Sequence, residues 1–284
     1  MAVTLRTLQA SELSLAVDWA AAEGWNPGLA DAACFATVDA QGFLLAERRG
    51  EPVGTISVVN YDERFAFLGF YIVRPDQRGQ GTGLQLWQQA IGHAGSRTIG
   101  LDGVLAQQHN YRRSGFVLAH RNIRYGGHVR PSTPSGDWPQ VDLREDLREV
   151  PFAAVEASDR TVFPAARADF LHAWIGAPGH RGRAVLERGR LRGWGVIRPC
   201  RLGYKVAPLV ADDASTARAI FDALVSTIPG EQVFIDVPEP NTAAVALARQ
   251  RGLHPVFETA RMYKGPPPDL ALDSLYGITS FELG

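Results

Sequence analysis

The stretch Val73-Arg74-Pro75-Asp76-Gln77-Arg78-Gly79-Gln80-Gly81-Thr82-Gly83 decides how this chain is interpreted. An apolar run ends just before it, and its three alternating glycines open a segment whose apolar residues recur at helical spacing. Glycine permits a positive φ and close approach of another molecule to the backbone. The first N–H groups of a helix have no partner within the helix and carry partial positive charge. The stretch is therefore typical of a pyrophosphate site.

Two widespread phosphate loops do not fit this stretch. A dinucleotide fingerprint needs G-x-G-x-x-G, but Leu84 or Leu86 stands where the last glycine is required. A Walker A loop needs Gly-Lys-Ser/Thr, which does not follow. Arg-Gly-x-Gly-x-Gly after Val-x-Pro instead resembles the acyl-CoA pyrophosphate loop of the GNAT N-acetyltransferase family. The alternative is a glycine-rich turn without a ligand.

A second motif lies one predicted strand and one predicted helix downstream. Tyr111-Arg112-Arg113-Ser114-Gly115-Phe116 is similar to the Y-x-x-x-G-F of the same family. The resemblance implies that the Tyr111 hydroxyl lies near the sulfur of coenzyme A and protonates the departing thiolate. The alternative for Tyr111 is a packed aromatic side chain with a hydrogen-bonded hydroxyl. The resemblance covers about residues 3–125.

The resemblance also implies how acetyl-CoA binds. Its thioester is expected along the strand 65–73, where a backbone N–H near Tyr71 or Ile72 acts as the oxyanion donor. Arg112 and Arg113 are candidates for contact with the 3′-phosphate, and the favoured alternative for each is a solvated helix arginine. The residues expected at the cofactor are Tyr71, Ile72, Val73, Arg78, Gly79, Gln80, Gly81, Thr82, Gly83, Asn110 and Arg113.

The sequence departs from the family at the position seven residues before the tyrosine. Many members have an asparagine there, and this chain has Val104. The contact that the asparagine makes to the cofactor is therefore missing, or Gln107, Gln108 or Asn110 supplies it.

The second departure concerns the catalytic base. Many members carry a glutamate on the strand before the loop, and residues 68–73 contain no carboxylate. An amine acceptor whose pKa is about 10 must lose a proton before it attacks. Asp102 is the first candidate for the base, followed by Asp62 and Glu63, and each of the three is also interpretable as a solvated turn residue. Water or the substrate itself is the remaining possibility.

The elements of the chain occur twice in a similar order, which predicts two copies of one unit. The first copy is expected to contain strands at 3–8, 43–48, 52–61, 65–73, 98–104 and 116–125, and helices at 11–23, 81–94 and 107–114. The second is expected to contain helices at 152–157, 164–174, 215–228 and 242–250, and strands at 183–186, 191–198, 203–208, 232–237 and 255–263. The tail, 275–284, is expected to add an edge strand.

These elements define the fold class and the domains. We expect an α/β fold of the α+β type, with two tandem GNAT-like units, each a mixed, mostly antiparallel sheet flanked by helices. Residues 126–140 are dense in glycine, proline and serine, which break helices and strands. The predicted domains are therefore 1–126, which binds acetyl-CoA, a linker at 127–141, and a degenerate GNAT-like unit at 142–284.

The second unit lacks the chemical residues of the first. Ala248 occupies the tyrosine position, although Asn241 and Gly252 keep the family's spacing. Asp212 and Asp213 replace the glycines, and they are expected to repel a pyrophosphate and to cap a helix N-terminus instead. We therefore expect one active site, in the first unit, with the second unit shaping the acceptor pocket.

Composition narrows the choice of partners. The 29 Lys and Arg residues against 30 Asp and Glu residues give a net charge of −1, which disfavours a nucleic-acid partner. The N-terminus lacks the layout of a signal peptide, and no window approaches 18 apolar residues. Cys34, Cys200 and the seven histidines show no metal-binding spacing. We expect a cytoplasmic monomer or homodimer without a metal or a membrane contact.

The predicted function is transfer of an acetyl group from acetyl-CoA directly to a primary amine of a small molecule. Two alternatives stay open, a non-catalytic acyl-CoA sensor and a protein or peptide N-acetyltransferase. Four aromatic residues are candidates for the acceptor pocket or for the core: Trp19, Trp25, Tyr61 and Trp174.

Overall fold

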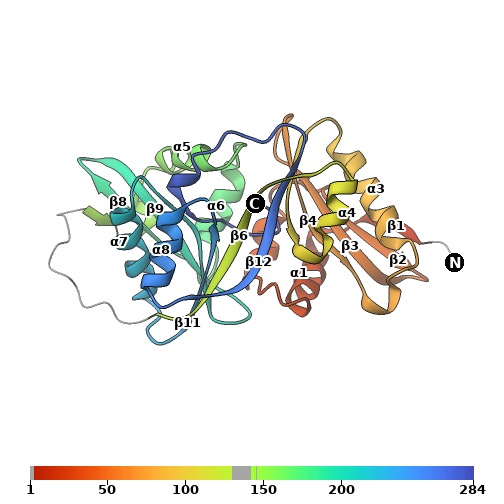
Figure 1. Cartoon of the computed structure of the whole chain (residues 1–284), viewed down its shortest axis with the longest axis horizontal. Coiled ribbons are helices and arrows are strands. Elements are labelled where there is room, and N and C mark those ends of the chain that lie inside the picture. The colour runs from red at the N-terminus through yellow and green to blue at the C-terminus, as the bar shows by residue number, and fades with distance from the viewer. Residues whose placement is uncertain (1–2, 130–141, 145) are drawn as a thin grey trace.

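A computed structural model describes residues 3–129, 142–144 and 146–284, which form one continuous sheet with helices on its faces (Figure 1). The strands of the first half are β1 (Thr4–Thr7), β2 (Phe43–Arg48), β3 (Glu51–Asn60), β4 (Phe65–Val73), β5 (Thr98–Val104) and β6 (Val117–His128). Its helices are α1 (Leu13–Ala22), α2 (Asp31–Phe35), α3 (Thr82–Ala94) and α4 (Gln108–Arg113), with short 3₁₀ turns at Ala10–Glu12, Pro75–Gln77 and Leu105–Gln107.

The second half repeats this order. Its strands are β7 (Asp142–Arg144), β8 (Arg181–Glu187), β9 (Arg190–Pro199), β10 (Tyr204–Ala211), β11 (Gln232–Pro238), β12 (His254–Lys264) and β13 (Leu275–Gly277). Its helices are α5 (Phe152–Val162), α6 (Ala168–Gly176), α7 (Ala214–Val225) and α8 (Thr242–Gln250), with 3₁₀ turns at Leu147–Glu149 and Leu272–Ser274. The predicted repeat is confirmed, and the sequence missed only short elements such as α2 and β7.

The two halves exchange their closing strands. The sheet runs β1-β2-β3-β4-β5-β12-β6-β11-β10-β9-β8-β7, so β12 of the second half lies beside β5, and β6 of the first half lies beside β11. β6 and β12 pair with each other in antiparallel fashion and cross at the middle of the molecule (Figure 1). Among the described strands, β4–β5 and β10–β11 are the parallel pairs. The expected mixed, mostly antiparallel sheet is confirmed, but one sheet replaces two separate ones.

The exchange bears on the predicted linker at 127–141. Its first residues, Gly127 and His128, belong to β6 and pair with β11. Residues 130–141 lie outside the described residues. The domain boundary itself stays a prediction.

Two arginine–aspartate pairs fasten the exchanged strands. Arg124 on β6 donates two hydrogen bonds to Asp236 on β11, at 2.6 and 2.8 Å. Arg261 on β12 does the same to Asp102 on β5, at 3.0 and 2.7 Å. Asp102 and Asp236 are each the fifth residue of a seven-residue strand, so the two pairs are equivalent in the two units. All four side chains are buried, and each pair joins one half of the chain to the other.

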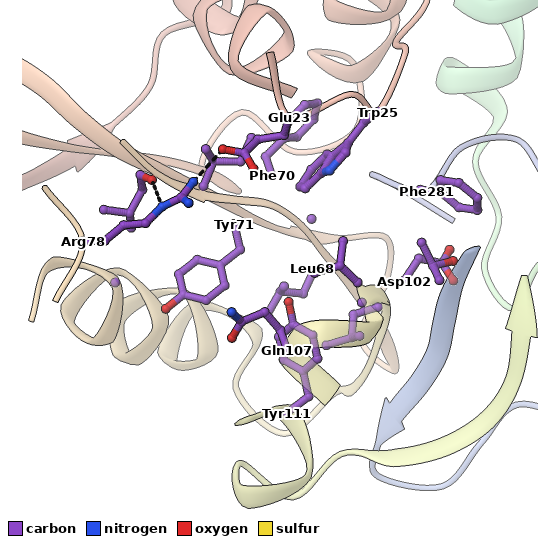
Figure 2. A pocket seen from close by; sticks show the side chains of 18 of the residues that line it. Glu23, Trp25, Leu68, Phe70, Tyr71, Arg78, Asp102, Gln107, Tyr111 and Phe281 are labelled. Atoms are coloured by element: carbon purple, nitrogen blue, oxygen red, sulfur yellow. Dashed lines mark hydrogen bonds and ion pairs between the residues drawn. The ribbon is translucent and has the colours of Figure 1, made fainter. Parts of the chain in front are cut away.

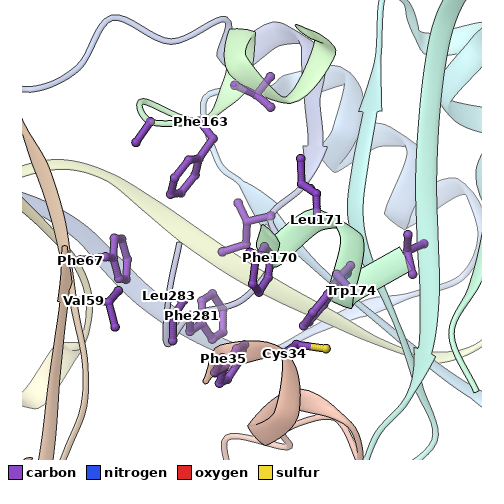
Figure 3. Close-up of a cluster of buried hydrophobic side chains, with 14 of the residues drawn as sticks. Cys34, Phe35, Val59, Phe67, Phe163, Phe170, Leu171, Trp174, Phe281 and Leu283 are labelled. Atoms are coloured by element: carbon purple, nitrogen blue, oxygen red, sulfur yellow. The ribbon is translucent and has the colours of Figure 1, made fainter. Parts of the chain in front are cut away.

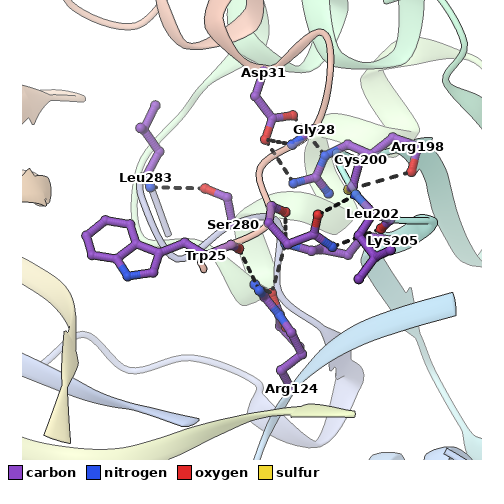
Figure 4. A network of polar contacts seen from close by, with 12 residues as sticks. Trp25, Gly28, Asp31, Arg124, Arg198, Cys200, Leu202, Lys205, Ser280 and Leu283 are labelled. Atoms are coloured by element: carbon purple, nitrogen blue, oxygen red, sulfur yellow. Dashed lines mark hydrogen bonds and ion pairs between the residues drawn. The ribbon is translucent and has the colours of Figure 1, made fainter. Parts of the chain in front are cut away.

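A third cross-half pair belongs to the network in Figure 4. Arg198 on β9 donates to both carboxylate oxygens of Asp31 on α2, at 2.9 and 3.1 Å, and both side chains are fully buried. Burial alone would raise the pKa of the Asp31 carboxyl, but the adjacent Arg198 guanidinium outweighs burial and lowers it. The pair keeps its charges, and the two halves are held together on this side of the sheet as well.

The largest hydrophobic cluster is shared by both halves (Figure 3). Phe35 of α2 stacks on Trp174 of α6, with ring centroids 6.2 Å apart. Trp174 is fully buried, so it belongs to this core and not to a pocket. The tail also enters the cluster, through Phe281 and Leu283. Two smaller clusters lie under α3 in the first half and under α7 and α8 in the second.

The tail, 275–284, is buried along its whole length. Its strand β13 pairs with β10, and the N–H of Ile278 donates to the carbonyl of Asp236 on β11. The prediction of an edge strand is therefore wrong, because β13 lies between β10 and β11 where those strands diverge.

Asn241 holds the start of the tail. Its amide donates to the carbonyls of Leu272, Asp273 and Leu275.

We expect Asn241→Ala to lower the free energy of unfolding by about 2–3 kcal/mol, measured by urea denaturation. The side chain also accepts from the N–H of Ala244 as the cap of α8, so the variant loses a helix cap and the amide donors together. The control is Asn110→Ala, an exposed asparagine within the short helix α4, with an expected loss below about 0.5 kcal/mol. Equal stability of the two variants would contradict this role of Asn241.

Candidate active site

The glycine loop has the backbone conformation that its sequence predicts. Gly79 and Gly81 have φ of +75° and +81°, which side chains disfavour. Gly81 is also the N-cap of α3, so the free N–H groups of this 13-residue helix start at the loop. Nothing lies within 4 Å of a Cβ built at either glycine, which leaves the backbone accessible to a ligand.

Arg48 lies beside this loop and was missed by the sequence reasoning. Its guanidinium donates to Gln77 Oε1 at 2.8 Å and to Thr82 Oγ1 at 3.3 Å, and it also contacts the Gln80 side-chain oxygen. Its Nε is buried without a partner among the described residues. Arg48 is the last residue of β2, 31 residues before Gly79, and no local motif marks it. It adds positive charge beside the glycine loop.

Strands β4 and β5 diverge next to the loop. Their registered pairs run from Phe65–Thr98 to Leu68–Leu101 and end there. Just beyond, β4 bulges, because its pairing with β3 skips from Gly69 to Ile72 and Phe70 has a φ of +47°. The pairing of β4 with β5 therefore ends before Tyr71 and Ile72, near which the resemblance implies an oxyanion donor.

A cavity of about 440 Å³ occupies the gap between these strands. Figure 2 shows that it runs from Arg78 and Tyr71, near the glycine loop, to Trp25, Asp102 and Phe281 at the other end. The volume lies within the usual range for small-molecule sites. The cavity is therefore continuous from the anion site to the interior of the molecule.

The cavity brings together most of the expected site residues. Those that line it are Tyr71, Ile72, Val73, Arg78, Gly79, Gly81, Gly83, Asp102 and Tyr111. Gln80, Thr82, Asn110 and Arg113 are not among its lining residues. Thr82 is buried and bonded to Arg48, whereas Asn110 and Arg113 are exposed on α4. Gln107, weighed as a substitute for the missing asparagine, does line the cavity.

Tyr111 is buried at the side of the cavity and held by its neighbours. Its ring stacks on Trp87 of α3, with centroids 5.7 Å apart, and lies against Gly103 of β5, where an added Cβ would be 2.3 Å from the ring. Burial raises the pKa of the Tyr111 hydroxyl, and neighbouring Tyr71 raises it further. The hydroxyl therefore keeps its proton at neutral pH, as a general acid must.

Asp102 lines the cavity, but its carboxylate is already engaged. Besides the two bonds from Arg261, it accepts one from Asn122 Nδ2 at 2.7 Å. Its counterpart Asp236 makes the same arginine pair in the second unit, where Ala248 stands at the position of Tyr111. This geometry favours a structural role over that of a base. Asp62 also serves structure, because it accepts from the N–H groups of Arg64 and Phe65 in the turn before β4.

The second unit differs from the first at both the loop and the strand gap. Asp213 caps α7 by accepting from the N–H of Thr216, as its sequence predicted. The gap between β10 and β11 is filled by β13, and a Cβ at Gly277 would lie 3.1 Å from Ile235. The chain itself thus occupies the space that corresponds to the cavity of the first unit.

The part of the chain that the structure describes contains no group of three or more His, Cys, Asp or Glu residues arranged to hold a metal ion. Within the same residues, none of the helices is both long enough and apolar enough to cross a membrane.

Comparisons with known proteins agree with the two-unit architecture. Residues 6–116 match the model of the acetyltransferase (GNAT) family, and residues 155–277 match that of an acetyltransferase (GNAT) domain. A relative named holothin acyltransferase, from Pseudoalteromonas sp. (strain SANK 73390), is 32% identical over 99% of this chain and 94% of its own length. The chain belongs to the GNAT acyltransferase family.

Solved structures share the fold over nearly the whole chain. A putative acetyltransferase from Pyrococcus horikoshii superimposes with a TM-score of 0.83 at 23% identity, over 99% of this chain and 96% of the other. A tandem GNAT protein from the clavulanic acid biosynthesis pathway gives a TM-score of 0.67 at 16% identity, over 94% and 100%. At these identities the likeness establishes the fold alone.

We expect Asp102→Asn and Asp236→Asn each to lower the free energy of unfolding by about 3–5 kcal/mol, because each leaves a buried arginine without its counter-charge. Urea denaturation measures both. The acyl-transfer activity of Asp102→Asn should then fall only in proportion to the fraction of protein that is unfolded. A fully stable Asp102→Asn variant that has lost its activity would instead identify Asp102 as the base.

We expect Tyr111→Phe to lower kcat about 100-fold or more while leaving the affinity for acetyl-CoA unchanged, since a general acid contributes at this scale. Thiol release measures the rate, and calorimetry measures the affinity. Tyr204→Phe, at a tyrosine of β10 outside the cavity, is the control and should keep the wild-type rate. An unchanged kcat in Tyr111→Phe would remove Tyr111 from the mechanism.

Proposed function

We propose that the chain transfers an acyl group, acetyl in the first place, from acyl-CoA to a primary amine of a small molecule. One observation carries the proposal: a single cavity joins the glycine loop, the diverging strands β4 and β5, and Tyr111. The order of these three features matches the order of pyrophosphate, pantetheine and thioester in acyl-CoA.

The residues around the loop fit the cofactor. Gly79 and Gly81 leave open space above the backbone, and the start of α3 adds N–H donors. Arg48 and Arg78 bring two guanidinium groups to the same end, which suits a pyrophosphate. Arg78 is paired with Glu23 at 2.6 Å, so its charge is partly compensated until an anion competes for it.

The cofactor supplies an activated thioester, and the protein supplies position and a proton. The acceptor nitrogen bonds to the carbonyl carbon while a backbone N–H near the Phe70 bulge stabilises the oxyanion. The carbon–sulfur bond then breaks, and the Tyr111 hydroxyl protonates the sulfur. The nitrogen loses one proton, which restores Tyr111 by way of water. The products are an amide and a free thiol, and no covalent enzyme intermediate is required.

The far end of the cavity supports a small acceptor over a protein. Phe257 and Thr259 of β12 and Phe281 of the tail form part of its wall, so the second half of the chain encloses this end. The 32%-identical relative is named for holothin as its acceptor and for an acyl group that its name does not specify further. Both observations favour a transferase that acts on a small molecule.

We expect Gly81→Glu to abolish acetyl-CoA binding, measured by calorimetry, because the new carboxylate would enter the pyrophosphate site. The matched control is Gly230→Glu in the second unit. Gly230 has a φ of +80° and nothing within 4 Å of an added Cβ, so both variants carry the same backbone strain. Wild-type protein and the control should bind one acetyl-CoA per chain. Normal affinity in Gly81→Glu would remove the loop from the site, and two sites per chain would contradict the silent second unit.

A further inference from the structure

The end of the cavity away from the glycine loop is lined by aromatic rings from three distant parts of the chain. Trp25 follows α1, Phe257 comes from β12, and Phe281 comes from the tail. Phe257 and Phe281 are 5.9 Å apart between ring centroids and tilted by 50°. Such a group of rings offers flat apolar faces on which another ring can stack.

The residues that line the cavity carry no uncompensated negative charge. The titratable residues that line the cavity are Glu23, Asp102, Arg78, Tyr71 and Tyr111. Glu23 is paired with Arg78, and Asp102 with Arg261. Burial raises the pKa of both tyrosines, so both stay neutral. The residues that line the cavity therefore offer no unpaired carboxylate to an alkylammonium ion.

Aromatic rings alone can also attract a cation, but these rings are already used in that way. The Arg124 guanidinium lies 4.8 Å from the centroid of Phe281 and 5.7 Å from that of Phe257. Its charge is balanced by Asp236. Arg124 thus already occupies the cation–π position over both rings. The aromatic end thus favours a neutral ring.

One polar group in this wall lacks a partner. Thr259 is 2% exposed, lines the cavity, and its hydroxyl has no hydrogen-bond partner among the described residues. A buried hydroxyl without a partner costs free energy. A ligand with one hydrogen-bonding group at its ring or amine would satisfy it.

We propose that the acceptor is a flat, uncharged aromatic amine that stacks among Trp25, Phe257 and Phe281 and bonds to Thr259. The inference rests on the proposed acyl transfer and names its substrate class. It also accounts for the absence of a glutamate on β4. An alkylamine with a pKa of about 10 is protonated at neutral pH and needs a base. An aromatic amine, whose lone pair is delocalised into its ring, attacks without one.

The test compares aniline-type and benzylamine-type acceptors that share one ring and differ by one carbon. Wild-type protein, acetyl-CoA and each amine are combined from pH 6 to 9, and the released thiol is measured. We expect kcat/KM for the aniline type to be at least about tenfold higher at pH 7 and nearly constant with pH. For the benzylamine type, kcat/KM should rise about tenfold per pH unit below the amine pKa.

Variants locate the acceptor. Phe281→Leu should raise KM for the aniline-type acceptor by about tenfold. Thr259→Val should raise the same KM. Both should leave kcat and acetyl-CoA affinity close to wild type. The matched control is Phe163→Leu, because Phe163 is a buried phenylalanine outside the cavity with Arg167 3.8 Å over its ring. That variant should keep the wild-type KM.

Preference for the benzylamine type would overturn the aromatic acceptor and leave acyl transfer standing. Consumption of neither amine, with acetyl-CoA still bound at one site, would also overturn it. An equal rise of KM in Phe163→Leu and Phe281→Leu would contradict stacking on Phe281. Failure of the wild-type protein to bind acetyl-CoA would instead overturn the proposed function itself, and the inference with it.

Discussion

The antiparallel pairing of β6 with β12 is the constraint on which the rest of the structure depends. Each strand closes the sheet of the other half, so neither half completes its hydrogen-bond ladder alone. On either side of this pairing, the buried pair Arg124–Asp236 joins β6 to β11. The buried pair Arg261–Asp102 joins β12 to β5. Removing one partner would leave the other charge buried and uncompensated, so each pair ties a strand of one half to a strand of the other.

The same divergence of two parallel strands is used in opposite ways in the two units. Between β4 and β5 it is left open and becomes the cavity. Between β10 and β11 it is closed by β13, which Asn241 fastens through three carbonyls. The tail then continues into the first unit, where the Glu282 carbonyl lies so close to Gly69 that a Cβ there would be 2.0 Å away. One segment therefore fills the second unit's gap and forms a wall of the first unit's cavity.

The local sequence predicted the helices and strands, and it predicted those candidate site residues that belong to one short motif. The bounds of β4, β5 and α8, the glycine loop and Tyr111 all follow from periodicity or from a motif a few residues long. The strand exchange could not be predicted, because alternation fixes which face of a strand is buried but not which strand lies beside it. Arg48, Thr259 and Phe281 were missed for the same reason. They reach the site through pairings between distant residues, and no local pattern marks them.

The exchange also explains how a second unit without a phosphate loop can matter to the chemistry. β12 crosses into the first half as a structural strand, and in doing so it delivers Phe257 and Thr259 to the cavity. Arg124, paired with Asp236 of the second unit, lies over the rings of Phe257 and Phe281. Under the proposed function, the first unit supplies the cofactor loop and the proton, and the second supplies the surface that a small acceptor meets. A change in β12 or the tail would alter the choice of acceptor without touching the cofactor site.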